Sequence, residues 1–192
     1  MTTETTSARA RPMGVEQRQD MIIGVVIPLI LEHGRDLTSK QIAEACGIAE
    51  GTIFRAFGDK DTLIKAAVDR YLDPLALRTS LRSIDHDLSL DDKLKAVFGL
   101  LRERFTGVIR MMSALGTPGP PPGRRAPDTH EFAVVVGELL APHADELRIT
   151  PEQVAQFARV VAFASAIPAF GESIPFTTDE LLDLFKHGVM EG

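Results

Sequence analysis

Apolar residues recur every three or four positions through most of the chain, and no segment alternates apolar and polar residues as a half-buried strand does. The longest series runs from Leu94 to Leu115 and predicts one helix of about seven turns over residues 91–115. The expected fold class is therefore all-α.

Glycine, proline and helix-capping residues divide the N-terminal part of the chain into shorter helices. A first helix is predicted from about Val15 to His33. Pro28 crowds the carbonyl four residues back, which belongs to Gly24, so a kinked helix is expected rather than two separate ones. Gly34 is the natural end of this helix.

Three short helices follow in the predicted order. Thr38 and Gln41 have the spacing of a capping box and predict a second helix that ends near Gly47. A third helix should cover about Ala49–Phe57, and a fourth should follow with Asp59 as its cap.

The back of the chain has a different pattern. Residues 78–90 are expected to form a linker or a short helix ahead of the long helix, and the proline-rich residues 117–128 fit no regular element. Three further helices should follow near residues 129–141, from about Pro151 to Phe170 with Pro168 bending or ending it, and after the cap Thr177, with Glu180 completing a capping box.

Composition narrows the class of protein. The 192 residues are 44% hydrophobic, which suits one large core or a small module joined to a larger one. The single cysteine, Cys46, lies among apolar neighbours, which favours a packed side chain over a reactive thiol. The longest apolar run, residues 21–31, is too short to cross a bilayer, and residues 1–14 lack the apolar run of a secretory signal. A cytoplasmic protein without a membrane partner is expected.

Net charge restricts how nucleic acid could bind. The chain carries −6, with 9 Lys/Arg against 10 Asp/Glu in residues 1–70 (−1) and 12 against 17 in residues 71–192 (−5). Neither part offers a broad basic field, so any DNA contact must come from locally placed donors.

Residues 38–57 nevertheless have the spacing of a helix-turn-helix motif. Gly47 can adopt the left-handed turn conformation, and Ala43 is small where the two helices approach. The expected shared core is Ile42, Ile48, Ile53 and Phe57, and the exposed face of the third helix would carry Glu50, Gly51, Thr52 and Arg55. The alternative is a tight helical hairpin inside a bundle.

Residues 22–64 resemble the DNA-binding domain of the TetR family of transcriptional regulators. The shared features are the apolar first helix and its glycine, the threonine before the second helix, Ile-Ala, the Gly-Ile turn, Gly-Thr-Ile-aromatic, and then Phe57, Lys60 and Leu-Ile. The resemblance implies a homodimer with two recognition helices in successive major grooves of a palindromic double-stranded operator. It also implies a repressor that a small effector releases.

The resemblance implies a division of the chain and a set of DNA contacts. The expected parts are a flexible arm (1–14), the helix-turn-helix domain (15–58), a connecting helix (59–77) and a helical domain for effector binding and dimerisation (78–192). Phosphates would meet the starts of the second and fourth helices, and bases would meet the third. The expected DNA-binding residues are Thr38, Ser39, Lys40, Gly51, Thr52, Phe54, Arg55 and Lys60.

Several positions depart from the family pattern. Phe54 and Ala56 stand where the family usually has Tyr and then His or Tyr, so two phosphate donors are absent. Glu50 replaces a common basic residue, and Ala49 replaces the usual capping Ser at a cost of about 1 kcal/mol. DNA affinity and its salt dependence should fall. The alternatives are help from three arginines of the N-terminal segment, a different reading code, or a protein that has lost DNA binding. Those arginines are Arg9, Arg11 and Arg18.

The larger domain is rich in Phe and Met, which is first of all a helical core. The resemblance adds a pocket for a small, mainly apolar effector, with candidate lining residues Phe98, Leu101, Phe105, Met112, Phe132 and Phe163. A stripe of small residues and the last helix are candidates for a four-helix dimer contact, with an internal contact as the alternative. The candidate interface residues are Ala158, Ala162, Ala166, Leu181 and Phe185.

No enzymatic site is predicted. The five histidines are dispersed without metal-ligand spacing, and no glycine-rich phosphate loop occurs. Asp85, His86 and Asp87 are interpreted as part of a solvated linker. His130 and Glu131 are interpreted as the exposed first turn of a helix. No cofactor or metal is expected.

Overall fold

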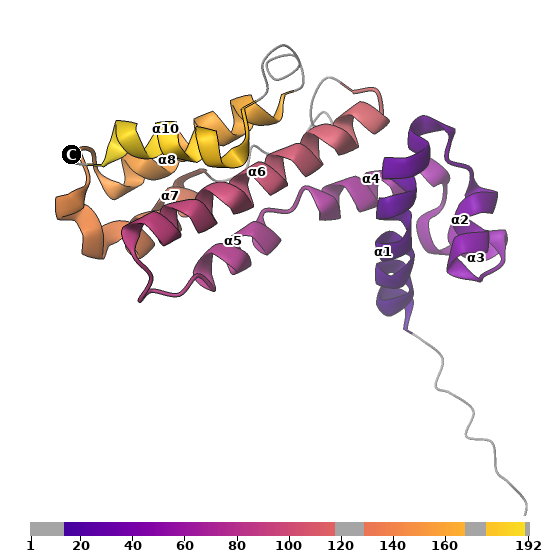
Figure 1. Cartoon of the computed structure of the whole chain (residues 1–192). Coiled ribbons are helices and arrows are strands. Elements are labelled where there is room, and N and C mark those ends of the chain that lie inside the picture. The colour runs from indigo at the N-terminus through magenta and orange to yellow at the C-terminus, as the bar shows by residue number, and fades with distance from the viewer. Residues whose placement is uncertain (1–13, 118–128, 168–175, 191–192) are drawn as a thin grey trace, which may run out of the picture. The chain divides into compact units, whose positions relative to one another are not determined.

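The computed structural model describes residues 14–117, 129–167 and 176–190 (Figure 1). Within these ranges the chain forms helices and no strand, and extended backbone pairs only in an isolated antiparallel bridge between Leu147 and Met190. The all-α prediction is confirmed. None of the described helices combines the length and apolarity needed to cross a membrane.

Some predicted features lie outside the described residues. They are most of the proline-rich segment, the end of the helix predicted up to Phe170 together with Pro168, and Arg9 and Arg11 of the arm. The chain divides into two compact units, Met1–Tyr71 and Leu72–Gly192, and each is described by itself.

The first unit contains four helices among its described residues: α1 (Val15–His33), α2 (Ser39–Cys46), α3 (Glu50–Phe57) and α4 (Lys60–Tyr71). A 3-10 turn, η1 (Gly34–Asp36), follows α1, which runs through Pro28 as a single helix, as predicted. The helix α1 packs against α2, α3 and α4. The buried apolar side chains of this unit include Ile22, Val26, Ile30, Leu37, Ile42, Ile53, Leu63 and Ala67.

The predicted core of the motif is only partly correct. Ile42 and Ile53 are buried, but Ile48 and Phe57 are half-buried. Ile48 lies in the turn and lines a surface groove, so part of its side chain faces solvent. Phe57 is the last residue of α3, where fewer neighbours can cover a ring.

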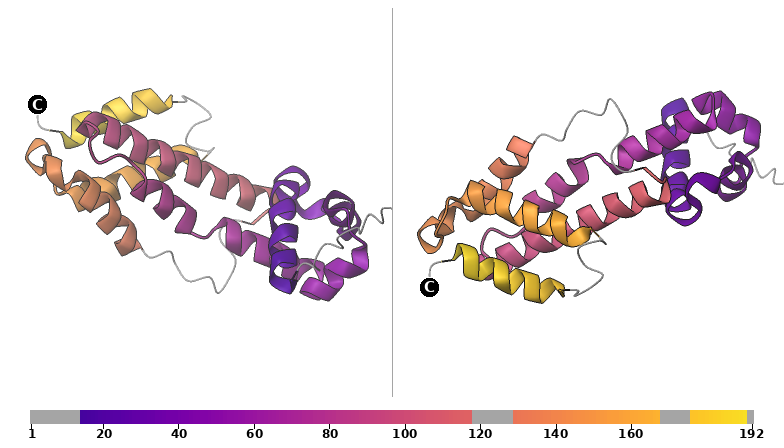
Figure 2. Two further views of the ribbon diagram at one scale, coloured as in Figure 1. Left: turned by 90° about the horizontal axis from the view of Figure 1, so that it is seen from below. Right: turned by 90° about the horizontal axis from the view of Figure 1, so that it is seen from above.

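The second unit is built around one long helix. Its elements are α5 (Leu75–Arg82), α6 (Leu90–Ala114), α7 (Thr129–Leu140), the 3-10 segment η2 (Ala141–Glu146), α8 (Pro151–Ala166) and α10 (Thr178–Val189). The helix α6 packs against α5, α7, α8 and α10, and the views in Figure 2 show these helices beside it. Its apolar face, including Leu94, Val97, Phe98 and Leu101, forms the centre of the core, as the periodicity predicted.

Predicted helix ends are mostly confirmed where a cap marks them. Thr177 caps α10 with Glu180, as expected. Residues 78–90, predicted as a linker or short helix, include only the last part of α5, because that helix begins earlier, at Leu75. The side chain of Asp73 accepts a hydrogen bond from the Leu75 N–H at 2.8 Å, which starts the helix directly after Pro74.

A lysine lies inside the core of the second unit. Lys93 of α6 is fully buried, and its Nζ lies 3.0 Å from Nε2 of His143 in η2. His143 Nδ1 in turn lies 2.7 Å from a carboxylate oxygen of Glu146. An ammonium can only donate, so with Lys93 charged the imidazole accepts at Nε2 and donates from Nδ1. Periodicity gave no reason to single out Lys93.

Candidate DNA-binding site

The helix α2 begins with the predicted capping box. The Thr38 hydroxyl accepts from the Gln41 N–H at 3.2 Å, and the Gln41 side-chain carbonyl accepts from the Thr38 N–H at 2.8 Å. Two N–H groups that a helix start leaves unsatisfied are therefore paired within the cap. Lys40 forms an exposed pair with Glu44 at 3.9 Å, a contact that contributes little to stability.

The turn between α2 and α3 depends on one glycine. Gly47 has φ 65° and ψ 32°, in the left-handed region. Its N–H and that of Ile48 bond back to the end of α2, including a 3.0 Å bond from Ile48 N to Ala43 O. The predicted turn is confirmed, and it fixes where α3 leaves α2.

The helix α3 presents most of its surface to solvent. Ile53 is buried and anchors it, whereas Glu50, Gly51 and Arg55 are exposed and Thr52 is half-buried. Ala49 is the N-cap and makes no side-chain cap bond, as its sequence indicates. The described structure therefore places the predicted Gly51, Thr52 and Arg55 together on an accessible helix face.

A hydrogen bond ties α1 to the end of α3. Gln19 Nε2 of α1 donates to the backbone carbonyl of Ala56 at 2.7 Å. This bond fixes the register of the two helices where their side chains face each other. The sequence gave no signal for it, because Gln19 and Ala56 are 37 positions apart.

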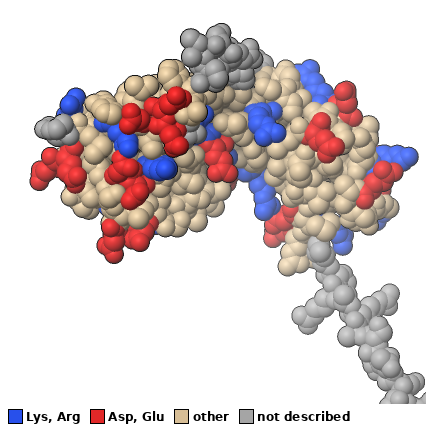
Figure 3. Space-filling view, viewed as in Figure 1, with Lys and Arg blue, Asp and Glu red and all other residues tan. Residues whose placement is uncertain are grey.

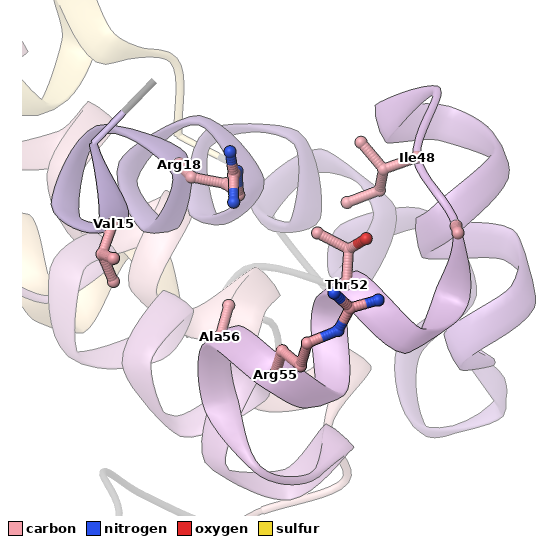
Figure 4. Close-up of a pocket in the computed structure, with 7 residues that line it drawn as sticks. Val15, Arg18, Ile48, Thr52, Arg55 and Ala56 are labelled. Atoms are coloured by element: carbon pink, nitrogen blue, oxygen red, sulfur yellow. The ribbon is translucent and has the colours of Figure 1, made fainter. Parts of the chain in front are cut away.

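Between α1 and α3 lies an open groove of about 450 Å³ (Figure 4). Its lining residues are Val15, Arg18, Ile48, Ala49, Thr52, Arg55 and Ala56. In the close-up the side chains of Arg18, Thr52 and Arg55 converge on the groove from the two helices. Two of them were predicted DNA contacts, whereas Arg18 was considered only as part of the N-terminal segment.

Lys60 has a partner within the first unit. Its Nζ donates to the Leu37 carbonyl at 2.9 Å and so joins the start of α4 to the residue before the α2 cap. Asp59 caps α4 by accepting from the Thr62 N–H at 2.6 Å. Hydrogen bonds from the backbone and side chain of Thr62 lower the pKa of the Asp59 carboxyl.

Charges on the visible face are mixed. Figure 3 shows Lys and Arg interspersed with Asp and Glu and no continuous basic field on that face. This distribution matches the near balance of charge in the first seventy residues.

The predicted effector residues of the second unit fall into two groups. Phe98, Leu101, Met112 and Phe132 are buried. Phe105 is half-buried and meets the exposed Phe163 edge-on, with ring centroids 5.3 Å apart. Phe98 instead stacks on Phe185, with centroids 5.8 Å apart.

The predicted dimer-interface residues also fall into two groups, buried and half-buried. Ala158, Ala162 and Phe185 are buried in the core of the second unit, and Ala166 and Leu181 are half-buried. The internal contact weighed as the alternative therefore accounts for the three buried ones. Large apolar side chains are exposed elsewhere on the same two helices: Phe157, Val160, Phe163 and Leu184.

The fold and the α2–turn–α3 geometry define a helix-turn-helix protein with a second helical unit. A family model described as bacterial regulatory proteins of the tetR family matches residues 27–67, which include the helix-turn-helix, in agreement with the resemblance found in the sequence.

One curated relative shares a modest sequence identity with about half of this chain. The chain is 27% identical over 100 residues to the HTH-type transcriptional repressor ComR of Escherichia coli (strain K12), over 52% of this chain and 47% of that protein. The matched part thus spans about half the length of that relative.

Solved structures share the fold over nearly the whole chain. A TetR transcriptional regulator from Streptomyces coelicolor has 23% identity and a TM-score of 0.56, covering 90% of this chain and 98% of the other. NalD of Pseudomonas aeruginosa, the secondary repressor of the MexAB-OprM multidrug efflux pump, has 19% identity and a TM-score of 0.53 over 92% and 97%. The SmeT–triclosan complex has 15% identity and a TM-score of 0.59 over 91% and 92%.

Proposed function

We propose that this protein regulates transcription by binding operator DNA through α3. The observation that carries the proposal is the helix face held outward by the Gly47 turn and the buried Ile53. Gly51 lets the helix backbone approach base edges closely, and Thr52 offers a hydroxyl and a methyl for base contact. Arg55 and the exposed Phe54 lie on the same helix and complete the contact surface.

Phosphate contacts come from the helix starts around this face. Thr38, Ser39 and Lys40 begin α2, where N–H groups point outward and favour an anion. The Lys60 ammonium has three N–H donors, one of which binds Leu37. Its remaining donors would meet a phosphate at the start of α4.

The proposed mode of action is repression relieved by a small, mainly apolar molecule. ComR and NalD are described as repressors, and SmeT has been solved with triclosan. The half-buried Phe105 and its partner Phe163 offer aromatic surface for such a molecule in the second unit. The molecule must bind one arrangement of the protein better than the DNA-competent one.

The protein acts as a homodimer in this proposal, so that two copies of α3 meet a palindromic operator. The contact uses α8 and α10 of each copy. Phe157 and Val160 lie three residues apart and exposed on α8, and Leu184 is exposed on α10. Exposed apolar side chains at helical spacing favour helix packing against a partner.

The DNA proposal is tested with a duplex taken from upstream of the gene and a random duplex of equal length, both at low salt. The Lys60→Ala variant should weaken binding to all sequences, whereas Thr52→Ala should change the preference among them. Lys65→Ala is the matched control, because Lys65 pairs with Asp69 on α4. A wild-type protein without preference for the upstream duplex would instead support a helical ligand-binding or scaffold protein that has lost DNA binding.

Two further measurements test the finer statements. Val160→Glu places a charge in the proposed dimer contact and should halve the molar mass measured by light scattering, while Glu152→Gln on the same helix should not. Triclosan is the first effector probe: it should raise the melting temperature of the wild type and release DNA, and it should do both less well in Phe163→Ala. Failure of a wider panel of apolar compounds to do either would contradict the effector proposal.

A further inference from the structure

The groove between α1 and α3 has the side chains of an oxyanion site. Arg18 and Arg55 approach it from different helices, and Thr52 is also part of the lining (Figure 4). The other four lining residues are apolar, and no carboxylate is among the seven. Two permanent guanidinium charges and a hydroxyl suit the oxygens of a phosphate.

The position of Arg55 is set by its own helix. Its Nε donates to the Gly51 carbonyl at 3.2 Å, which turns the guanidinium back along α3. Among the described residues no carboxylate lies within ion-pairing distance of this group. The terminal amino groups are therefore available to an external acceptor at the groove.

The position of Arg18 is set by the packing of α1 on α3. Gln19, the next residue, bonds the Ala56 carbonyl, so α1 is fixed where Arg18 borders the groove. Ala49 and Ala56 leave this space open because their side chains are single methyl groups. Neither Phe54 nor Ala56 can donate a side-chain hydrogen bond, so α3 alone offers Thr52 and Arg55 here.

The size of the groove indicates part of a larger ligand. A volume of about 450 Å³ lies within the ~300–1,000 Å³ typical of sites for whole molecules and exceeds what one small ion fills. The groove also borders the face of α3 that the proposed function turns toward DNA.

We propose that Arg18 and Arg55 together bind one phosphate of the DNA backbone, so that α1 supplies a phosphate contact that α3 lacks. This inference rests on the proposed DNA-binding function and adds Arg18, which lies outside the residues 27–67 matched by the family model. The same two arginines could take a free phosphate ion, and the experiment separates the two sources.

The experiment measures binding of fluorescent duplexes to the full chain over a series of salt concentrations. The upstream duplex and a random duplex are used with wild type, Arg18→Ala, Arg18→Lys and the control Lys65→Ala. Loss of one phosphate contact should weaken binding to both duplexes roughly eightfold per subunit at 0.1 M salt and lower the salt slope by about 0.9 per subunit. Arg18→Lys should recover part of the affinity, and Lys65→Ala should bind as wild type does.

Each other outcome overturns a distinct statement. If the wild type binds no duplex, the proposed function fails, and with it this inference. If the wild type binds but Arg18→Ala binds equally well with the same slope, only the Arg18 contact is wrong. If Arg18→Ala changes the ranking of sequences, Arg18 reads a base instead. If calorimetry finds inorganic phosphate bound through Arg18 while duplex affinity is unchanged, the groove is a small-anion site. Circular dichroism of each variant checks that it is folded.

Discussion

The two units of this protein are specified in different ways. The first is divided by local signals: the Thr38 capping box, the left-handed Gly47 and the Asp59 cap each end or begin a helix of 8 to 12 residues. The second depends on burial along α6, whose 25 residues contact four other helices. Local signals thus define the shape of the proposed DNA-contacting unit, whereas long-range packing defines the other.

Their interiors differ as well. Of the described side chains that are polar or charged, Lys93 is the one that is buried, and it lies in the second unit. The first unit has an apolar interior and places its cations at the surface or, for Lys60, against a backbone carbonyl. The single tyrosine, Tyr71, lies in the first unit, and the chain has no tryptophan. Tyrosine fluorescence therefore reports on the end of α4 in the first unit, and circular dichroism reports on both units.

The largest expected effect separates the units by stability. Phe98→Ala removes a buried ring that stacks on Phe185 and should cost about 3–5 kcal/mol. In urea, the circular dichroism transition should shift further than the Tyr71 fluorescence transition. Ile53→Ala in the first unit should produce the opposite order. Equal shifts of both signals in both variants would show that the units unfold as one.

The buried lysine gives the next largest effect. His143→Ala leaves the Lys93 ammonium without its imidazole acceptor and should cost about 1.5–3 kcal/mol in urea denaturation. Lys93→Met replaces the charge by an apolar side chain of similar length and should be neutral or stabilising. A loss with Lys93→Met as large as that with His143→Ala would contradict this account.

Two glycines provide a matched pair between the units. Gly47→Ala forces a side chain into the left-handed region and should destabilise the first unit by about 1 kcal/mol, measured by Tyr71 fluorescence in urea. Gly99→Ala in α6 has open space for its methyl and should stabilise the second unit by about 0.5–1 kcal/mol. A Gly47→Ala variant that is as stable as the wild type would mean that the left-handed turn conformation is not required. A destabilising Gly99→Ala would mean that a methyl group is not tolerated at that position of α6.

The smallest effect is a pH dependence present in both units. Hydrogen bonds from Thr62 lower the pKa of Asp59, and hydrogen bonds from Thr177 lower the pKa of Glu180. A depressed folded pKa gives stability that is complete above the ordinary values of 3.8 and 4.5 and is lost as pH falls through the lowered ones. Asp59→Asn and Glu180→Gln should each flatten the acid limb of stability between roughly pH 5 and 2. An unchanged acid limb would exclude these caps as its source.

The sequence predicted those features whose causes lie within a few residues. Helix type, the Thr38 and Thr177 caps and the Gly47 turn are of this kind. It missed those that need two distant segments to meet, such as Gln19 with Ala56 and Lys93 with His143. Helical period also cannot tell which face of a helix its own subunit will cover, so Phe185 was assigned to an interface although it stacks in the core.

The candidate site was predictable to the same degree. Thr52 and Arg55 were expected on α3 because a single helix brings them together. Arg18 entered only as a charge near the start of the chain, because the groove exists only once α1 has packed on α3.

The bridge between Leu147 and Met190 sets an order of events on the ribosome. Together with the 2.9 Å bond from Arg148 N to Val189 O, it fastens the end of α10 to the segment before α8. This contact of the second unit cannot form until residue 190 has been made, whereas the first unit ends at Tyr71. At about 5–20 residues per second, the nascent chain carries a complete first unit for roughly 6 to 24 s before this contact of the second unit can form.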